Sequence, residues 1–206
     1  MATEKKYKLS YFDLRGRGEV PRMIFNYVGV EFEDKRIPFP EWPAVKSTFP
    51  LGFIPVITTP DGTDISQTLA CIMYMGDEFS LYGNNASQRG VINCVVISMK
   101  EIHDHCANIA VFLKEEEEKE KVRAILDKKI PIFFKYFEEL RSQNSSSAFL
   151  VSKSITIADF FLVDTLEFIS AAMPGRDFLA DYPKLKALND HIRGLDKVKE
   201  YLATRK

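Results

Sequence analysis

The segments of this chain that read as β-strands are confined to its first 80 residues, and most of its ten prolines lie among them. These segments are residues 8–12, 32–37, 54–58 and 63–66. After a polar break at 80–90, apolar residues recur at helical spacing and strand patterns largely disappear. The sequence therefore predicts an α+β fold with two domains, a mixed domain at 1–81 and an all-helical domain at 82–206.

The order of elements in the first domain constrains its sheet. Residues 18–29 carry apolar side chains at helical spacing between the first two strands, and a crossover helix of this kind joins parallel strands. The Pro-Asp-Gly turn signal at 60–62 separates the last two strands, which are therefore predicted to be antiparallel. A short helix at 41–48 and a longer one at 67–79 complete the order β-α-β-α-β-β-α, which is the thioredoxin-like arrangement.

The second domain is predicted to contain helices at 91–113, 122–140, 156–171, 182–193 and 196–203. The charged run at 114–121 is interpreted as a solvated helix end and turn. One helix start is well marked, because Thr156 suits the N-cap and Asp159 the acidic position of the first turn, while Ile155 and Phe160 can pack as a hydrophobic staple. We assign this stretch to folding rather than to chemistry.

Net charge, hydropathy and cysteine content limit the partners and the cellular compartment expected for this chain. A formal net charge of -1 gives no electrostatic case for binding nucleic acid or an anionic membrane surface. No apolar run approaches the roughly 18 residues of a membrane span, and the first residues lack the apolar core of a secretion signal. Cys71, Cys94 and Cys106 form no Cys-x-x-Cys pair and suit a reducing compartment. We expect a cytoplasmic protein without nucleic-acid or membrane partners.

Five short motifs, taken together and in order, carry a family resemblance. They are Tyr-Lys-Leu-Ser-Tyr-Phe-Asp-Leu-Arg-Gly-Arg-Gly-Glu at 7–19, Trp42 with Lys46-Ser47, Gly-Phe-Ile-Pro at 52–55, Gln-Thr-Leu-Ala at 67–70, and Thr-Ile-Ala-Asp at 156–159. With these motifs the chain resembles the sigma class of cytosolic glutathione S-transferases, which includes helminth transferases and the haematopoietic-type prostaglandin D synthase. The resemblance spans essentially the whole chain. It implies a homodimeric detoxification enzyme that uses glutathione as co-substrate, without a metal ion, and conjugates it to small hydrophobic electrophiles.

The chemistry that the resemblance implies is the stabilisation of a thiolate. A free cysteine thiol has a pKa of about 8.5, and lowering it by about two units requires roughly 2.7 kcal/mol of preferential stabilisation of the anion. A neutral tyrosine hydroxyl that donates to sulfur can supply much of this, with help from a nearby guanidinium. By position in the family, Tyr11 is the donor and Arg17 the helper, so both are expected to be catalytic, and Tyr11 also to bind glutathione.

Four further residues are implied to hold the two ends of glutathione. Gln67 and Thr68 open a helix whose free N–H groups and positive dipole end suit the γ-glutamyl carboxylate. The indole N–H of Trp42 and the ammonium of Lys46 suit the glycyl carboxylate, the first as a hydrogen-bond donor and the second as a point charge.

The segment Phe53-Ile54-Pro55 is implied to meet the middle of the ligand. The resemblance implies a cis peptide bond before Pro55, which leaves the Ile54 backbone available to pair with the cysteinyl unit of glutathione like an added strand. Phe53 stands where many relatives carry Lys or Gln, so one polar contact to the glycyl end is in doubt.

The electrophile and a second subunit complete the expected site. Phe12 and Arg17 are assigned to the hydrophobic-substrate site, together with the inner face of the first long helix of the second domain. The acid that a second copy of the chain brings to the ligand ammonium is assigned to Glu101, with Asp104 just beyond it. A prostaglandin synthase would be expected to show a pair of aspartates in this stretch, and this chain does not.

Two alternative functions stay open at this point. One is an isomerase of the same fold that converts prostaglandin H2 to D2, and the other is a crystallin-like or ligand-carrier protein without catalysis. The retention of Tyr11, Trp42, Lys46 and Gln67 argues against a loss of glutathione binding.

Two other kinds of site are disfavoured by spacing. His103 and Cys106 can share a helix face, but two ligands are too few for a closed zinc site. The glycines of Gly16-Arg17-Gly18 lack the third glycine of a dinucleotide-binding fingerprint.

Overall fold

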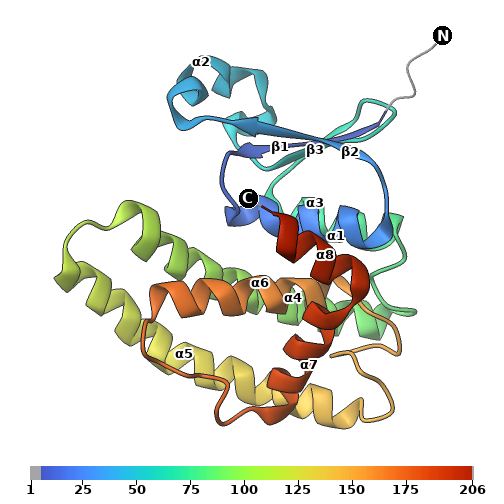
Figure 1. Ribbon diagram of the computed structural model, residues 1–206, viewed down its shortest axis with the longest axis vertical. Helices are drawn as coiled ribbons and strands as arrows, with labels where there is room; N and C mark the ends of the chain where they lie inside the picture. Colours follow the sequence, from blue (N-terminus) through green and yellow to red (C-terminus); the bar gives the residue numbers. More distant parts are fainter. Residues whose placement is uncertain (1–5, 206) are drawn as a thin grey trace. The chain divides into compact units, whose positions relative to one another are not determined.

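The computed structural model describes residues 6–205, which form two compact units (Figure 1). The first unit contains the described residues up to Ser80 together with those from Asp196 onward, and the second is Leu81–Leu195. The division expected from the sequence places residues 196–206 with the helical domain. Instead, α8 (Asp196–Thr204) contacts α1 (Glu19–Val28) within the first unit. Helical periodicity does not state which unit a helix packs on, so the sequence left this undetermined.

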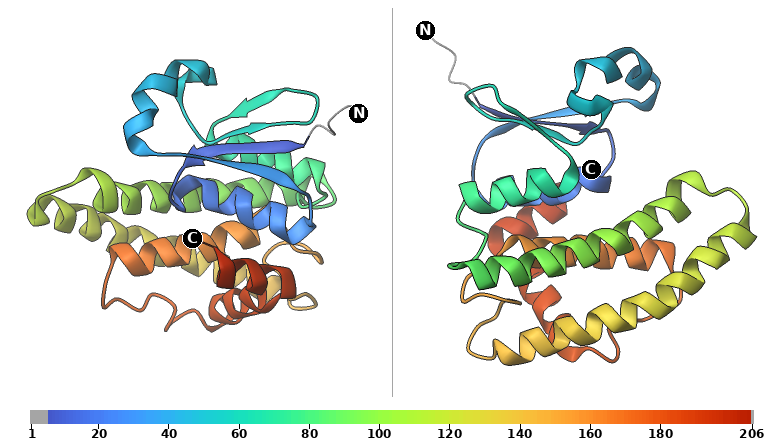
Figure 2. Two further views of the ribbon diagram at one scale, coloured as in Figure 1. Left: turned by 45° about the horizontal axis from the view of Figure 1, so that its top comes forward. Right: turned by 180° about the vertical axis from the view of Figure 1, so that it is seen from behind.

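The sheet of the first unit has four strands in the order β2-β1-β3-β4. Their bounds are β1 Tyr7–Phe12, β2 Phe32–Ile37, β3 Val56–Thr58 and β4 Asp64–Ser66. β1 and β2 are parallel, whereas the β1–β3 and β3–β4 pairs are antiparallel. Both predicted relations are thus confirmed, and with α1 and α3 (Thr68–Glu78) they give the predicted thioredoxin-like order. Figures 1 and 2 show α1 and α3 side by side on one face of this sheet.

The helix α1 buries the apolar face that its sequence pattern predicts. Val20, Ile24 and Phe25 are all almost fully buried. The helix ends at Gly29, whose φ of 75° lies in the left-handed region and whose N–H donates to the carbonyls of Phe25 and Asn26. This conformation favours glycine, so a side chain here would strain the turn that leads into β2.

The connection from β2 to β3 is a chain of short turns rather than the single short helix predicted at 41–48. It consists of η2 Phe39–Glu41, α2 Trp42–Val45, η3 Lys46–Thr48 and η4 Pro50–Gly52. Prolines at 38, 40, 43 and 50 remove backbone donors at close intervals, so no long run of i to i−4 hydrogen bonds can form. The segment therefore presents its side chains from several short turns beside the sheet.

The second unit is entirely helical. Its helices are α4 Ala86–Ala107, η5 Asn108–Phe112 of the π type, α5 Glu116–Gln143, α6 Ile157–Ala172 and α7 Pro183–Gly194. α4 packs against α6 along a face of fully buried side chains that includes Val95, Met99 and Ile102. No helix in the described part of the chain combines the length and the hydropathy needed to cross a bilayer.

Two helices begin earlier than the sequence pattern predicts. α4 starts at Ala86, because the Asn85 side chain accepts a hydrogen bond from the N–H of Gln88 at 2.9 Å and caps the helix. α5 starts at Glu116, so most of the charged run is the first turns of a helix rather than a turn between helices. Its first three residues are glutamates, whose charge is favourable at a helix N-terminus.

The predicted start of the helix at 156–171 is confirmed. The fully buried carboxylate of Asp159 accepts hydrogen bonds from the Thr156 N–H at 2.7 Å, the Thr156 hydroxyl at 2.9 Å and the Leu150 N–H at 2.9 Å. Ile155 and Phe160 are also buried. Burial raises the pKa of the Asp159 carboxyl to about 6. Asp159 thus joins the N-terminus of α6 to the preceding loop.

Candidate active site

The register of the sheet brings the predicted site residues to one end of the strands. Ser10 of β1 is opposite Val56 of β3, and Val56 is opposite Ser66 of β4. The next position in the same direction is Tyr11 on β1, Pro55 just before β3 and Gln67 just after β4, so these three residues lie in one row near this end of the sheet. Neighbouring strands lie roughly 4.8 Å apart. The row therefore brings Tyr11 together with two positions that lie more than forty residues later in the sequence.

The ring of Tyr11 is buried at the β1 end of this row. The residue is 7% exposed and belongs to an apolar cluster with Ile37, Ile54 and Val56, against which Phe12 and Trp42 pack. The phenol oxygen accepts a hydrogen bond from the backbone N–H of Arg17 at 3.0 Å. The fold thus joins Tyr11 and Arg17 through the Arg17 backbone N–H, whereas the sequence pointed to the Arg17 guanidinium as the helping group.

Two glycines make room for the Tyr11 ring. A Cβ atom at Gly16 would lie 2.8 Å from the Tyr11 hydroxyl oxygen, and one at Gly18 would lie 2.7 Å from Cδ1 of the ring. Gly16 also has a φ of 44°, in the left-handed region. In the sequence, these glycines read only as an incomplete dinucleotide fingerprint. Their actual role is to admit a ring at van der Waals distance, which only the three-dimensional contact reveals.

Replacing Gly18 by Ala is therefore expected to displace the Tyr11 ring and to lower turnover of the conjugation reaction about tenfold at neutral pH, a loss of about 1.4 kcal/mol in transition-state stabilisation. Steady-state kinetics at saturating glutathione measure this loss. Gly90→Ala is the matched control, since a Cβ there meets no atom within 4 Å. Equal turnover of Gly18→Ala and the control would contradict the assigned packing.

Trp42 and Phe12 form an aromatic group next to Tyr11. The Trp42 and Phe12 rings meet edge to face at 5.3 Å between centroids, and Phe12 stacks on Phe39 at 4.4 Å. The Phe12 and Tyr11 rings are 5.6 Å apart. Phe12 is thus held between neighbours on several sides, in a position fixed by packing.

Lys46 and Phe53 lie together at the surface of the first unit. The Lys46 ammonium is 5.9 Å from the centroid of the Phe53 ring, which is 57% exposed. Contact of this kind attracts a cation to the ring face and orients its side chain. Phe53 supplies no polar group, so Lys46 is the charged member of this pair.

The peptide bond between Ile54 and Pro55 is cis, as the resemblance implies. The β1–β3 ladder ends at Val56, so the backbone of Ile54 lies beyond the paired part of the strand. The Ile54 side chain is buried in the cluster that contains Tyr11. The segment around Ile54 therefore runs past the Tyr11 ring with backbone groups that lie outside the paired part of the sheet.

Gln67 has an unusual backbone conformation immediately before α3. Its φ of 80° and ψ of 132° lie outside the regions that non-glycine residues prefer. Such a conformation costs on the order of 1–3 kcal/mol and is found mainly at functional sites. Thr68, the first residue of α3, is buried, and the predicted start of this helix is confirmed. The strained residue therefore stands at the positive end of the helix dipole.

Glu101, the acid assigned to a second subunit, lies on α4 in the second unit. Its carboxylate forms an ion pair with the Lys129 ammonium of α5. The neighbouring Asp104 pairs with Lys100 at 2.6 Å on the same helix. Both acids therefore already have a cationic partner within the chain, a feature that the sequence analysis missed because Lys129 is 28 residues away.

Two cysteines and one histidine are buried in the interior, where their surroundings favour a structural role. Cys71 and Cys106 are fully buried, and burial raises the pKa of each thiol to about 12. Neither is therefore a thiolate nucleophile at neutral pH. Buried His103 contacts Asp164 through Nε2 at 2.9 Å. Among residues 6–205, no three His, Cys, Asp or Glu side chains form a group that could hold a metal ion.

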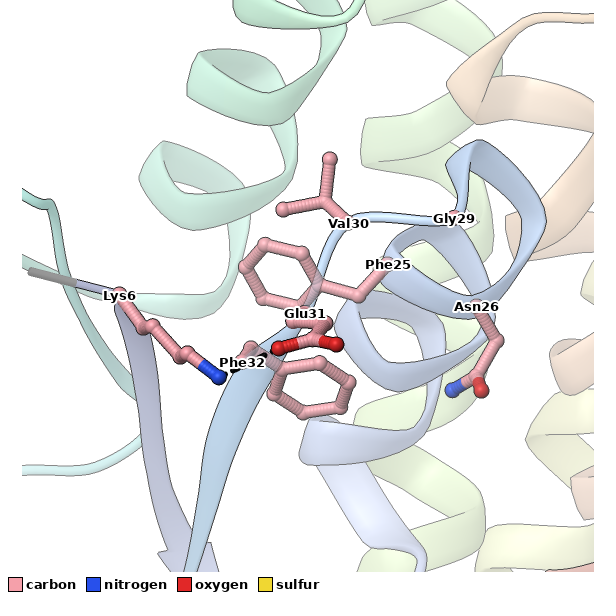
Figure 3. A pocket seen from close by; sticks show the side chains of 7 residues that line it. All are labelled: Lys6, Phe25, Asn26, Gly29, Val30, Glu31 and Phe32. Carbon is pink, nitrogen blue, oxygen red and sulfur yellow. Dashed lines mark hydrogen bonds and ion pairs between the residues drawn. The ribbon is translucent and has the colours of Figure 1, made fainter. Parts of the chain in front are cut away.

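A shallow hollow of about 390 Å³ lies at the opposite end of β1 (Figure 3). Figure 3 shows the ion pair between Lys6 and Glu31 beside the rings of Phe25 and Phe32, which stack at 4.5 Å between centroids. Lys6 precedes the first residue of β1, five residues from Tyr11, or roughly 17 Å along an extended strand. The ammonium of Lys6 and the carboxylate of Glu31 neutralise each other. The hollow is not part of the candidate site.

The comparisons with known proteins support the family level of the resemblance. The sequence profile described as "Glutathione S-transferase, C-terminal domain" matches residues 100–205. The chain is 31% identical to "Glutathione S-transferase 1" of Ascaris suum, with 97% of each chain covered. It is 33% identical to the "Hematopoietic prostaglandin D synthase" of Gallus gallus, with 97% of this chain and 96% of that one covered.

A solved structure shows the same fold over nearly the full length. The glutathione S-transferase from Ascaris lumbricoides superposes with a TM-score of 0.83 at 32% identity, with 98% of each chain covered. The sequence match and the structural match thus extend over both units. The chain belongs to the glutathione S-transferase family.

Proposed function

We propose that this protein is a glutathione transferase in which Tyr11 stabilises the thiolate of bound glutathione for attack on hydrophobic electrophiles. The observation that carries the proposal is the nearly buried Tyr11 hydroxyl, whose oxygen accepts the Arg17 N–H at 3.0 Å. Because hydrogen bonds in a chain polarise one another, this N–H makes the phenol a stronger donor through its own O–H. The acceptor that benefits most from such a donor is an anion.

The hydrogen bond from Tyr11 to the thiolate is strong enough to lower the thiol pKa by about two units. Hydrogen bonds to charged groups are worth about 1.5–3 kcal/mol, and lowering a thiol pKa from about 8.5 by two units needs roughly 2.7 kcal/mol. In the reaction, the thiol proton passes to solvent and the Tyr11 proton stays on its oxygen. The sulfur electron pair then forms a bond to the electrophilic carbon, and the leaving group departs with its own bonding pair. Binding both reactants supplies proximity.

The chain also offers groups that fit the rest of glutathione. The N-terminus of α3, which begins at Thr68, and the strained backbone of Gln67 before it suit the γ-glutamyl carboxylate. The unpaired backbone of Ile54 beside cis Pro55 suits the cysteinyl unit. Trp42 and Lys46 suit the glycyl carboxylate, and Phe53 contributes through its contact with Lys46.

Lys46→Ala is expected to weaken glutathione binding about tenfold, or about 1.4 kcal/mol, while turnover at saturating glutathione changes little. The reason is that the ammonium meets a carboxylate far from the reacting sulfur and acts equally in ground and transition states. Isothermal titration with glutathione measures the effect. Lys35→Ala is the control, because Lys35 is another exposed lysine over a phenylalanine ring, Phe49. A normal dissociation constant for Lys46→Ala would remove Lys46 from the site.

Several finer features belong to the same proposal. We infer from the motif set that the protein belongs to the sigma class, with a glutathione-binding domain at 1–81, on which α8 packs, and a helical domain over the rest of 82–206. Phe12 and Arg17 are assigned to the electrophile, and Glu101 to the ligand ammonium of a second subunit in a homodimer. The free cysteines suit the cytoplasm.

Prostaglandin H2 isomerisation is the second candidate, favoured by the identity to the chicken prostaglandin D synthase. Against it stands the α4 surface near Glu101, where the acids pair with Lys100 and Lys129 and no aspartate pair occurs. A product assay with prostaglandin H2 separates the two reactions. A crystallin-like protein without catalysis would show neither reaction.

The test of the proposed function is the ionisation state of the bound tripeptide. Ultraviolet difference spectra with saturating glutathione should show thiolate absorbance near neutral pH, and S-methylglutathione is the control that cannot ionise. Spectra that show a protonated thiol up to a pKa of about 8.5, the value of a free thiol, would reject the proposal.

A further inference from the structure

Arg22 of α1 is a fully buried cation next to the candidate site. Its residue exposure is 1%, and the guanidinium uses each of its nitrogens. Nε donates to both carboxylate oxygens of Asp34 at 3.0 and 3.1 Å. Nη1 donates to the carbonyls of Leu14 at 2.9 Å and Arg15 at 3.2 Å, and Nη2 donates to the carbonyl of Phe12 at 3.4 Å. One side chain thus links α1, β2 and three peptides of the segment 12–15.

That segment is the connection between Tyr11 and the N–H that meets its hydroxyl. β1 ends at Phe12, and Gly16–Gly18 forms the short helical turn η1, whose middle residue Arg17 donates to the Tyr11 oxygen. Gly16 and Gly18 hold the ring at contact distance. Any shift of the carbonyls at 12–15 therefore moves the Arg17 N–H relative to the phenol oxygen.

The charge of Arg22 also lies close to the Tyr11 ring. Its guanidinium carbon is 5.9 Å from the ring centroid. A cation at this distance is attracted by the ring face. Asp34, which anchors Arg22, is itself shared with Arg36 at 2.8 Å, and Arg36 reaches the side chain of Asp13. The segment is thus braced by two arginines, and of these Arg22 is the one that holds its backbone carbonyls. The Phe12 carbonyl also accepts the Leu14 N–H at 2.8 Å.

We propose that Arg22 is a positioning residue of the thiolate site: by holding the carbonyls of Phe12, Leu14 and Arg15 it fixes the Arg17 N–H on the Tyr11 hydroxyl. The inference rests on the proposed function of Tyr11. Arg22 does not touch the substrates; it acts through the geometry of the hydroxyl that does. A lysine cannot replace it, because one ammonium with three donors cannot reach Asp34 and three separate carbonyls at once.

The test compares Arg22→Lys with wild type by the pH dependence of the thiolate absorbance and of kcat/KM. We expect the pKa of bound glutathione to rise by about one unit, from about 6.5 to about 7.5, so that the thiolate share at pH 7 falls about threefold. The glutathione dissociation constant should stay within about threefold, because binding groups at both ends of the tripeptide are unchanged. At high pH, where glutathione ionises without help, kcat/KM should return toward the wild-type value.

Arg205→Lys is the matched control for a purely structural effect. Arg205 is another largely buried arginine of the first unit, and it pairs at 2.7 Å with Glu19 of α1, whose other carboxylate oxygen lies 3.9 Å from Arg22 Nη1. Arg205→Lys therefore perturbs the surroundings of Arg22 while leaving its hydrogen bonds to Asp34 and the three carbonyls in place. Its replacement is expected to lower the melting temperature and leave the thiol pKa unchanged. Arg22→Met gives the same volume without charge and should shift the thiol pKa at least as far as Arg22→Lys. Circular dichroism and melting curves confirm that each variant is folded under assay conditions.

The outcomes separate the inference from the proposed function. A lowered thiol pKa in wild type that Arg22→Lys and Arg22→Met leave unchanged would overturn the role of Arg22 and keep that of Tyr11. A loss of kcat/KM by the same factor at every pH in Arg22→Lys would also overturn it, because this marks loss of folded protein. A wild-type thiol pKa equal to that of free glutathione would reject the proposed function itself.

Discussion

Tyr11→Phe is expected to lower turnover with 1-chloro-2,4-dinitrobenzene at least tenfold at neutral pH while glutathione affinity changes little. The substitution removes one oxygen from a ring that is otherwise held by Gly16, Gly18 and its apolar neighbours, so the fold of the site should persist. What is lost is the O–H donor to sulfur, worth about 1.5–3 kcal/mol when the acceptor is charged. The substitution therefore weakens the stabilisation of the thiolate and of the transition state, and leaves the binding of the two carboxylate ends of glutathione unchanged.

The pH dependence of this variant provides a second readout. Without the donor, the pKa of bound glutathione should move back toward about 8.5, so the turnover deficit should shrink as the pH rises past that value. The absorbance titration of bound glutathione measures this pKa directly. A variant with the wild-type pKa and wild-type turnover would show that another group stabilises the anion.

Tyr7→Phe is the matched control, because Tyr7 lies on the same strand at its other end. Its hydroxyl donates to Glu78 at 2.8 Å and contacts the Tyr74 hydroxyl at 3.3 Å, away from the Tyr11 row. Removing this hydroxyl should cost about 1 kcal/mol of stability, the worth of an ordinary hydrogen bond, and leave turnover unchanged. Equal losses in the two variants would mean that the effect at Tyr11 is structural.

The parts of the fold that follow from local pattern could be predicted from the sequence. Strand β2 has the predicted bounds, because Gly29 before it and Pro38 after it in the sequence interrupt regular structure. The parallel and antiparallel pairs follow from the lengths of the connections between strands. The helix start at Thr156 follows from capping chemistry, which needs residues only three positions apart.

The parts that depend on contacts between distant residues could not be predicted. Glu101 meets Lys129 across two helices, and Arg205 reaches Glu19 from the other end of the chain. Gly18 is needed because a ring seven residues earlier lies against it, which no turn rule anticipates. The gathering of Tyr11, Pro55 and Gln67 was expected from the family resemblance, and its physical cause is the sheet register.

Asp159→Ala is expected to cause the largest loss of stability among the substitutions considered, about 3–5 kcal/mol. The change leaves three donors without their acceptor in the protein interior, namely the N–H groups of Leu150 and Thr156 and the Thr156 hydroxyl. Each unsatisfied buried group costs about 1–3 kcal/mol. Chemical denaturation of both proteins measures the difference, with the exposed Asp190→Ala of α7 as a control expected within about 0.5 kcal/mol of wild type.

The dependence of this loss on pH identifies its cause. Burial raises the pKa of the Asp159 carboxyl to about 6, whereas in the unfolded chain it is about 3.9. Between these values the folded state holds the proton more tightly, so the contribution of Asp159 to stability falls as the pH rises from about 4 to about 6. The gap between wild type and Asp159→Ala should therefore be widest in acid and level off above about pH 6. A gap that grows with pH would mean that the three donors outweigh burial and favour the ionised carboxylate. A gap below about 1 kcal/mol at every pH would mean that water satisfies the donors and that the cap does not hold α6 to its loop.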